Sequence, residues 1–263
     1  MAGAVTASMF VPAPPRMRLR AFLIHLGLSA IIFVLLMACI VWLWYPGPFF
    51  HHDGGWRGTL IVIAVDLVLG PALTLVVFDP AKVRRKIVLD LCVIGAIQAA
   101  ALAWGIQIVE GQRPVAAAFH AGAFHPVTAD LVRQQHGDLA RIAALGRDHP
   151  PLVNVELPAD LRARNEVMRH WREDGFALQT QPRLLSALAP GLPGLEAADR
   201  VVAQIAAVNP GFRNERDAFF AAHPEVGGAR LVPFHGRYGN VVFVIDAEAR
   251  LRGVLTHAFE GIL

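Results

Sequence analysis

Three long apolar runs constrain this chain more than any other feature. They cover residues 21–44, 59–78 and 87–109. At about 1.5 Å of rise per residue, a helix of roughly 20 residues crosses the ~30 Å hydrocarbon core of a bilayer. A helix in a soluble core does not need to be apolar on every face over such a length. The sequence therefore predicts an integral membrane protein with three transmembrane helices.

The composition is divided along the chain. Of the 263 residues, 55% are hydrophobic and 17% are charged, against about 25% charged in soluble domains. Most charged residues follow residue 110, so residues 111–263 are expected to form a soluble domain large enough to bury its own core. Both cysteines, Cys39 and Cys92, lie in apolar runs, so this domain is expected to fold without disulfides.

The net charge of +3 does not predict a nucleic-acid partner. No basic run with interleaved aromatic residues occurs in the second half of the chain, and such runs are typical of nucleic-acid binding. Much of the positive charge lies in two clusters beside the apolar runs, as expected for cytoplasmic loops of membrane proteins. The clusters are Arg16, Arg18 and Arg20, then Lys82, Arg84, Arg85 and Lys86.

The distribution of lysine and arginine predicts the orientation. The loop between the first two runs contains only Arg57, so both basic clusters are expected on the cytoplasmic side. Residues 1–20 are then a cytoplasmic tail (Met17 is an alternative start), residues 21–110 a three-helix membrane module, and residues 111–263 a domain across the membrane. A signal peptide is the alternative for the first run, but its length and its end at Trp42 and Trp44 favour an uncleaved anchor.

The second half alternates between strand and helix patterns. A hairpin is predicted over 114–128 and a strand over 152–157. Helices are predicted over 160–171, where Asp160 can cap the helix, and over 196–208 and 213–222. An antiparallel meander is predicted over 229–257. The expected fold class is a membrane α-helical module with three transmembrane helices plus an α+β domain with a small antiparallel sheet, in which the early hairpin pairs with the C-terminal strands.

Asp66 lies near the middle of the second apolar run. A carboxylate there costs at least a few kcal/mol unless it is paired, hydrated or protonated. His25, Gln98 and Gln107 on the other runs are its expected partners. Asp66 is interpreted in one of two ways. It holds the three helices together through a buried hydrogen bond, which contributes about 1 kcal/mol, or it is an acid that binds a partner protein. A single acid on three helices argues against a transporter. The pair Gly70-Pro71 predicts a helix irregularity and close packing.

The loop between the first two runs carries a dense set of turn residues and aromatic residues. The candidate loop motif comprises Tyr45, Pro46, Gly47, Pro48, Asp53, Gly54, Gly55 and Trp56. Beside it, the adjacent His51 and His52 point in different directions and lack further ligands at a suitable spacing. Four histidines of the second half, His120, His125, His136 and His149, are scattered among predicted loops and are interpreted as surface residues. No metal site is predicted.

The sequence contains no recognisable catalytic motif. Phosphate-binding loops, nucleophile elbows, Cys-x-x-Cys pairs and zinc-protease signatures are absent. No enzyme activity, catalytic residue or cofactor is therefore predicted.

Residues 44–49, 53–56 and 65–75 resemble the type IV pilin accessory proteins called TfpX/TfpZ. The resemblance extends through Phe78, Lys82, residues 90–91, Gln98, 101–102 and Gly105 to 113–115, and resumes at 244–246 and 253–255. It implies an inner-membrane, chaperone-like factor with a periplasmic domain, which assists a cognate type IV pilin and contacts the pilus assembly machinery and the lipid bilayer. Asp66 would then lock the helices together or meet the pilin helix, and the loop from Tyr45 would cap the bundle.

Two other classes of protein remain as alternatives. A membrane-anchored sensor or ligand-binding protein would use the second half as its sensing domain, but it needs a cytoplasmic output, and only the short tail and the 79–86 loop are expected there. A small transporter would require oligomerisation, because one acid on three helices provides no transport path.

Overall fold

The computed structural model describes residues 15–80, 82–174, 177–188 and 194–259. The first 14 residues of the predicted cytoplasmic tail lie outside the described residues. The chain divides into two compact units. We call residues 15–39 and 57–108 the helical unit, and residues 40–56 and 109–259 the sheet domain. The segment that links the first two apolar runs thus packs as part of the sheet domain.

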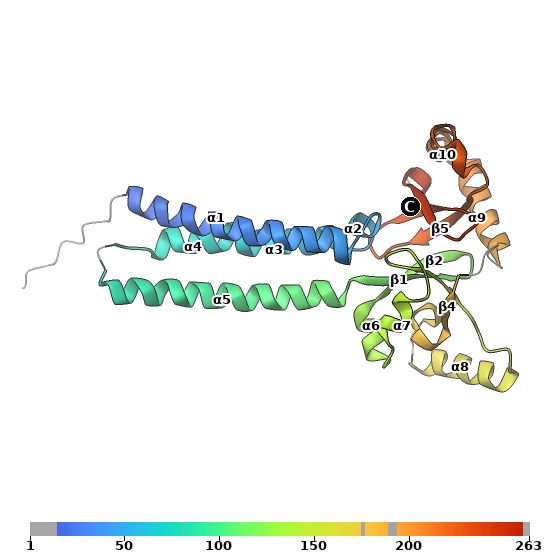
Figure 1. Ribbon diagram of the computed structural model, residues 1–263, viewed down its shortest axis with the longest axis horizontal. Coiled ribbons are helices and arrows are strands. Elements are labelled where there is room, and N and C mark those ends of the chain that lie inside the picture. Colours follow the sequence, from blue (N-terminus) through green and yellow to red (C-terminus); the bar gives the residue numbers. More distant parts are fainter. Residues whose placement is uncertain (1–14, 81, 175–176, 189–193, 260–263) are drawn as a thin grey trace, which may run out of the picture. The chain divides into compact units, whose positions relative to one another are not determined.

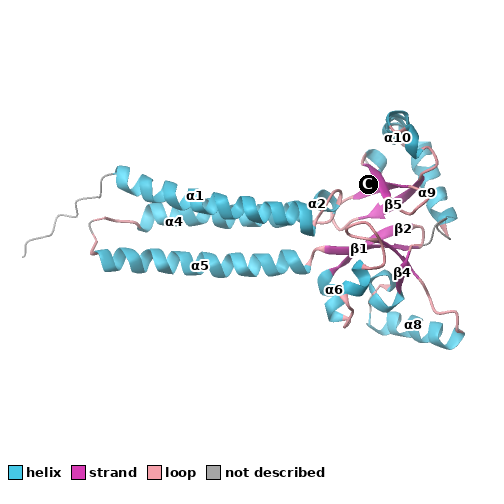
Figure 2. Cartoon of the chain, in the orientation of Figure 1, coloured by secondary structure: helices cyan, strands magenta, loops and turns pink. Residues whose placement is uncertain are grey.

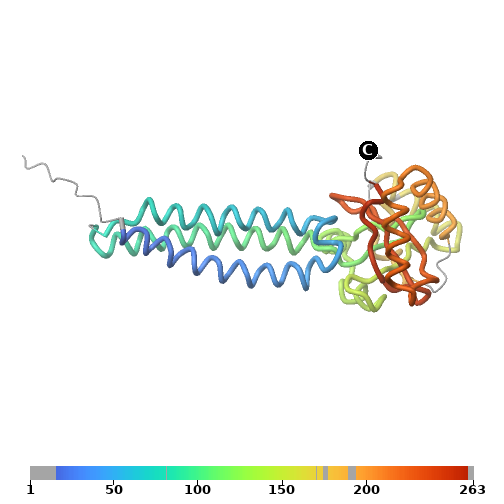
Figure 3. The backbone as a smooth tube through the Cα atoms, turned by 90° about the horizontal axis from the view of Figure 1, so that it is seen from above, coloured from blue at the N-terminus to red at the C-terminus, as the bar shows by residue number. Residues whose placement is uncertain are grey.

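Three helical segments make up the helical unit and run alongside one another (Figures 1 and 3). The first is α1 (Pro15–Cys39), the second consists of α3 (Gly55–Val62), a π-helical segment (Ile63–Leu69) and α4 (Gly70–Val77), and the third is α5 (Arg84–Gly111). The candidate membrane spans are Arg16–Trp44, Gly55–Val77 and Arg84–Gly111. Large apolar side chains are exposed along all three, including Leu35, Val76 and Ile97. The predicted set of three membrane-length helices is confirmed.

The Gly70-Pro71 pair produces a π-helical turn. Proline has no backbone N–H, so the regular helical bonding pattern is interrupted at Pro71. The N–H of Gly70 donates to the carbonyl of Val65, which is the five-residue spacing of a π turn. The predicted irregularity therefore appears as a widened helix over Ile63–Leu69, and Asp66 lies within it.

The sheet domain contains one seven-stranded sheet with the order β4-β3-β1-β2-β5-β6-β7. Figure 2 shows the strands in magenta. The strands are β1 (Pro114–His120), β2 (Ala123–Thr128), β3 (Leu152–Val155), β4 (Leu185–Ala187), β5 (Arg230–His235), β6 (Asn240–Ile245) and β7 (Leu251–Leu255). The hairpin β1–β2 lies beside the C-terminal meander β5–β7, as predicted. The sheet is larger than expected and mixed, because β1–β3 and β2–β5 are parallel pairs. In each parallel pair, the connection between the two strands contains helices, so the second strand runs in the same direction as the first.

Helices pack against both halves of this sheet. α9 (Leu195–Val208) contacts β5, and α10 (Pro210–Ala222) contacts β7. The short helices α6 (Ala129–Gln134) and α7 (Leu139–Ala143) pack against β2 and β1 respectively, and α8 (Leu161–Asp174) follows β3. The remaining helical pieces are the four-residue α2 (Phe49–His52), a π-helical segment (Ile40–Trp44) and single 3-10 turns at Leu178–Thr180, Pro182–Leu184, Pro224–Val226 and His257–Phe259.

Side-chain caps fix several helix starts. The predicted cap Asp160 accepts a hydrogen bond from the N–H of Ala163 at 2.9 Å. Asn209 accepts from the N–H of Phe212 at 3.0 Å, and its amide donates to the carbonyl of His257 at 2.7 Å. One buried asparagine thus begins α10 and also holds the chain after β7.

Candidate functional site

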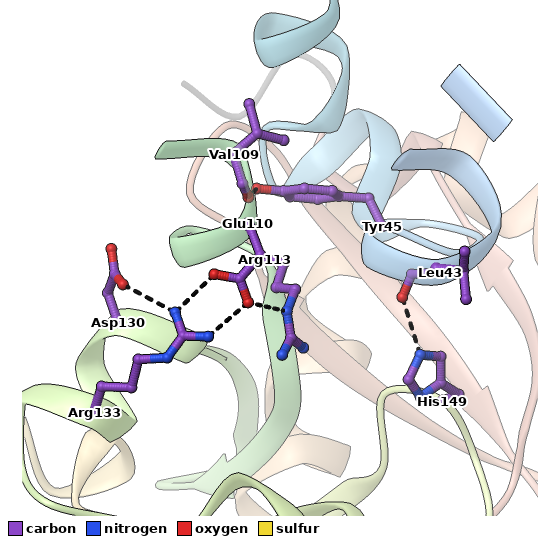
Figure 4. Close-up of polar contacts among 8 residues, drawn as sticks. All are labelled: Leu43, Tyr45, Val109, Glu110, Arg113, Asp130, Arg133 and His149. Atoms are coloured by element: carbon purple, nitrogen blue, oxygen red, sulfur yellow. Dashed lines mark hydrogen bonds and ion pairs between the residues drawn. The ribbon is translucent and has the colours of Figure 1, made fainter. Parts of the chain in front are cut away.

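Tyr45 fixes the start of the 45–56 loop in the sheet domain. Its side chain is only 2% exposed, and its hydroxyl donates to the carbonyl of Val109 at 2.9 Å (Figure 4). Burial raises the pKa of Tyr45 to about 12, so the phenol stays protonated and keeps this donor at any physiological pH. A buried tyrosine hydroxyl usually requires such a partner.

Phe49 inserts the loop into the core of the sheet domain. Its side chain is 2% exposed, and its ring meets Phe234 edge-on at a centroid distance of 5.4 Å and Phe243 at 6.2 Å. Phe234 and Phe243 stack on each other at 4.5 Å. Phe124 contacts Phe243 at 5.9 Å and extends the same aromatic cluster. The loop therefore contributes a core residue and is not merely a surface connection.

Asp53 and Arg237 form a buried ion pair. The Asp53 side chain is fully buried, and Arg237 Nε and Nη2 donate to its two carboxylate oxygens at 2.8 Å and 3.0 Å. Arg237 Nη1 also donates to Gln112 Oε1 at 2.6 Å, and Nη2 donates to the carbonyl of Gln112 at 2.7 Å. The guanidinium thus joins three segments: the loop, the residue that follows α5, and the turn between β5 and β6.

The electrostatics of this pair show why both partners are needed. Burial raises the pKa of Asp53, although the hydrogen bonds and charge of Arg237 oppose that increase. Burial also acts to lower the pKa of Arg237, but the hydrogen bonds and the charge of Asp53, together with Tyr45, outweigh burial and raise the pKa. Each charge alone would be costly in this position, because a buried ion without its partner loses its hydration and gains nothing in return.

Close contacts explain the glycines of the loop. Gly54 has a φ of +104°, and a Cβ at this position would lie 2.7 Å from the ring of Tyr238. A Cβ on Gly55 would meet the ring of Phe50 at 2.7 Å. Before them, Tyr45 to Pro48 form the turn, with Pro46 beside Gly47 at a φ of +59°, and Pro48 precedes the short helix α2. Trp56 contacts Phe50 edge-on at 6.2 Å.

A second polar network lies where α5 leads into the sheet (Figure 4). Glu110 accepts from Arg113 Nε at 3.0 Å and from both terminal nitrogens of Arg133 at 2.6 Å and 2.7 Å. Arg133 also reaches Asp130 at 3.4 Å. Elsewhere, His149 Nε2 lies 3.0 Å from the carbonyl of Leu43. This network ties α6 to the last turn of α5.

Sequence reasoning missed Arg237, Glu110 and Arg133. The turn that contains Arg237 is visible as a Gly-Arg-Tyr-Gly pattern at 236–239, but nothing local links it to Asp53. The only available signal was the presence of a basic residue in one predicted turn and of a single acid in a glycine-rich loop far away in the sequence.

A polar cluster lies inside the helical unit. His25 Nδ1 is 2.5 Å from Thr74 Oγ1. Asp66 is 4% exposed, and its Oδ2 has no hydrogen-bond partner among the described residues. Gln98 packs so closely on Gly70 that a Cβ there would lie 1.7 Å from its amide nitrogen. Of the expected partners, His25 is close enough to Asp66 to interact with its charge, although its hydrogen bond goes to Thr74. Gln98 packs on Gly70, and Gln107 is exposed.

The histidines of the sheet domain do not assemble into a metal site. Within the described part of the chain, no group of three or more histidine, cysteine or acidic side chains could hold a metal ion. His125 is partly buried and lies beside His235, with ring centroids 5.5 Å apart. Burial lowers the pKa of His125 to about 4, and the nearby His235 and His120 contribute to the decrease.

We expect the sheet domain to lose stability between pH 6.5 and about 4. The unfolded chain binds a proton at the ordinary histidine pKa, whereas folded His125 binds it only near pH 4, so protonation favours unfolding in this window. The loss should be about 2 kcal/mol, discounted for the partial exposure of the ring. Urea titrations of the full-length protein in detergent, read by pulse proteolysis, should show a shallower pH slope for His125→Gln. His136→Gln, at an exposed histidine that does not contribute to the shift of His125, should keep the wild-type slope. An unchanged slope in His125→Gln would contradict the assignment.

Comparison with known proteins shows a family match that includes most of the 45–56 loop. The profile of the family described as fimbrial assembly protein FimB matches residues 14–54. A fimbrial assembly protein of serogroups C1 and C2 from Dichelobacter nodosus is 31% identical over 96 residues, which are 36% of this chain and 73% of that relative. The chain belongs to the family of fimbrial assembly proteins.

Other members of this fimbrial assembly family match over a smaller share of their length. The serogroup I and serogroup E1 proteins of Dichelobacter nodosus are 31% and 30% identical over 96 residues, and the match spans 37% of each. No solved structure matches the chain. The family profile covers α1 and the loop through Gly54, so it includes the three loop anchors Tyr45, Phe49 and Asp53.

Proposed function

We propose that this protein is an inner-membrane accessory factor that assists a type IV pilin by direct contact and without catalysis. The observation that carries the proposal is the family match over residues 14–54, which joins a membrane-length helix to the anchored loop. The resemblance of residues 44–49 and 65–75 to the TfpX/TfpZ accessory proteins supports this narrower assignment within the fimbrial assembly family. The further partners proposed are components of the inner-membrane pilus assembly machinery.

The membrane placement is part of the same proposal. The basic clusters at 16–20 and 82–86 lie at the ends of candidate spans, which favours a cytoplasmic N-terminus and a periplasmic sheet domain. A subunit with an apolar helix and a folded head, held in the membrane before assembly, would need a partner with surfaces of both kinds. The helical unit and the sheet domain offer one surface each.

Two roles for Asp66 remain within this proposal. Asp66 Oδ2 has no hydrogen-bond partner among the described residues. This supports a role in which Asp66 accepts a hydrogen bond from the pilin helix, since a buried intramembrane carboxylate oxygen without a hydrogen bond is costly. The alternative is an internal lock among the three helices, to which Gln98 and the His25–Thr74 pair contribute.

Photocrosslinking in living cells tests the proposal. A photoreactive residue at Leu69, which is 53% exposed in the helical unit, should give an adduct with the native pilin. A second probe at Tyr238 reports on the sheet domain, because Phe49 is buried and unsuitable. Loss of the Leu69 adduct in Asp66→Asn, with the protein still inserted, would support docking by Asp66, and a retained adduct would support the lock. No pilin adduct from either probe, nor from exposed Val208 or Leu161, would favour a ligand-binding sensor.

A further inference from the structure

An apolar groove runs along one end of the helical unit. It encloses about 690 Å³ between α1, α4 and α5. From α1 it is lined by one helical stripe that ends with Leu28, and from the other helices by Thr74, Phe78, Leu91 and Gly95. All of these residues belong to the helical unit.

The length of the groove matches one leaflet of a bilayer. Its α1 stripe begins at Arg16 and ends at Leu28, which is about 18 Å along a helix. Half of the hydrocarbon core of a bilayer is about 15 Å thick. A transmembrane helix of a partner protein crosses both leaflets, so it would require a groove about twice as long. An acyl chain of a single lipid occupies one leaflet only.

The two ends of the groove differ in charge. Arg16 and Arg20 line the end at the start of α1, and both side chains are exposed. Neither forms an ion pair with another residue in the described part of the chain. The inner end is lined by Leu28 and by His25 and Thr74, which are hydrogen-bonded to each other. Guanidinium groups bind phosphate oxygens through paired hydrogen bonds, so the charged end suits an anionic phosphate.

We propose that this groove binds one anionic phospholipid of the leaflet that faces the N-terminus, with its phosphate held by Arg16 and Arg20. This inference rests on the membrane placement proposed above. One acyl chain lies along Ile24 and Leu28 toward Gly95. Because lipid tails are as apolar as the groove, burial of the chain provides little selectivity. Selection among lipids comes from the charge of the head group.

Gly95 is a position at which a larger side chain can fill the groove, and Gly105 on the same helix provides the matched control. A Cβ added at Gly95 would meet no heavy atom within 4 Å, and the same holds for Gly105 farther along α5, which does not line the groove. Gly95→Phe therefore fills the groove without removing a charge. Gly105→Phe places the same side chain on the same helix and leaves the groove open.

Native mass spectrometry of the delipidated full-length protein tests the proposal, with dioleoyl phosphatidylglycerol and dioleoyl phosphatidylcholine as probes. The wild type should retain one phosphatidylglycerol with on the order of tenfold preference over phosphatidylcholine. Arg16→Gln/Arg20→Gln should abolish the preference, and Gly95→Phe should reduce the binding of both lipids. Gly105→Phe and Arg84→Gln/Arg85→Gln, which removes two charges outside the groove, should bind as the wild type does.

Three outcomes would overturn the lipid site. These are equal retention of the two lipids by the wild type, wild-type binding by Gly95→Phe, and a photoreactive residue at Leu28 that labels a protein instead of lipid. Carbonate extraction of each variant checks insertion separately, so a failure of the membrane placement is distinguished from an empty groove. Gel filtration of the Gly95→Phe protein verifies that its helices remain assembled.

Discussion

Arg237→Ala should lower the free energy of unfolding of the sheet domain by about 3–4 kcal/mol. The substitution leaves the Asp53 carboxylate fully buried without the two side-chain hydrogen bonds that it accepts from Arg237. Only the bond from the backbone N–H of residue 237, at 3.3 Å, is kept, and breaking a buried pair from one side typically costs that much. It also removes both bonds to Gln112. The loss is measured by urea titration of the full-length protein in detergent with pulse proteolysis as the readout.

Two further variants test whether the loss of stability in Arg237→Ala comes from the unpaired charge of Asp53. Asp53→Asn added to Arg237→Ala should recover part of the loss, because the orphaned charge is gone while the side-chain shape is kept. Arg169→Ala breaks an exposed pair with Glu173 and should change stability by less than about 0.5 kcal/mol. If Arg237→Ala is as mild as Arg169→Ala, the loop is not held by this ion pair.

Phe49→Ala should destabilise the sheet domain by about 3–5 kcal/mol. The ring lies in an aromatic cluster with Phe234 and Phe243, and truncation of a buried phenylalanine leaves a cavity and removes edge-to-face contacts. The same titration measures the effect, with protease sensitivity of the 45–56 loop as a second readout.

Phe50→Ala is the matched control for Phe49→Ala. Phe50 is adjacent and of the same type, but it is only partly buried and contacts His51 and Trp56. It should cost roughly half as much or less, since less apolar area leaves water when it packs. Equal losses for the two variants would mean that the loop does not contribute Phe49 to the core.

The predictable part of this protein follows from local patterns. The three apolar runs could be identified because a helix in hydrocarbon must satisfy its own backbone and present apolar side chains on every face. The hairpin β1–β2 and the meander β5–β7 could be identified from alternation and turn residues. Gly70-Pro71 predicted an irregularity because proline removes a donor regardless of its surroundings.

The unpredictable part depends on residues far apart in the sequence. Asp53 pairs with Arg237, which lies 184 positions away, and His25 bonds Thr74, a residue that had no assigned role in the sequence analysis. Two features of the sheet have almost no local signal in the sequence. The strand β4 is only three residues long. The parallel pairing of β2 with β5 depends on a long crossover between the two strands.

The sequence by itself determined the three membrane-length helices, the separate α+β domain and the motifs of the loop, since each depends on side chains next to one another along the chain. Only the tertiary structure decided that the 45–56 loop is a part of the sheet domain, with Tyr45, Phe49 and Asp53 buried in it. Burial and charge pairing depend on which distant residues meet, and that is fixed by packing of the whole domain, not by any local pattern.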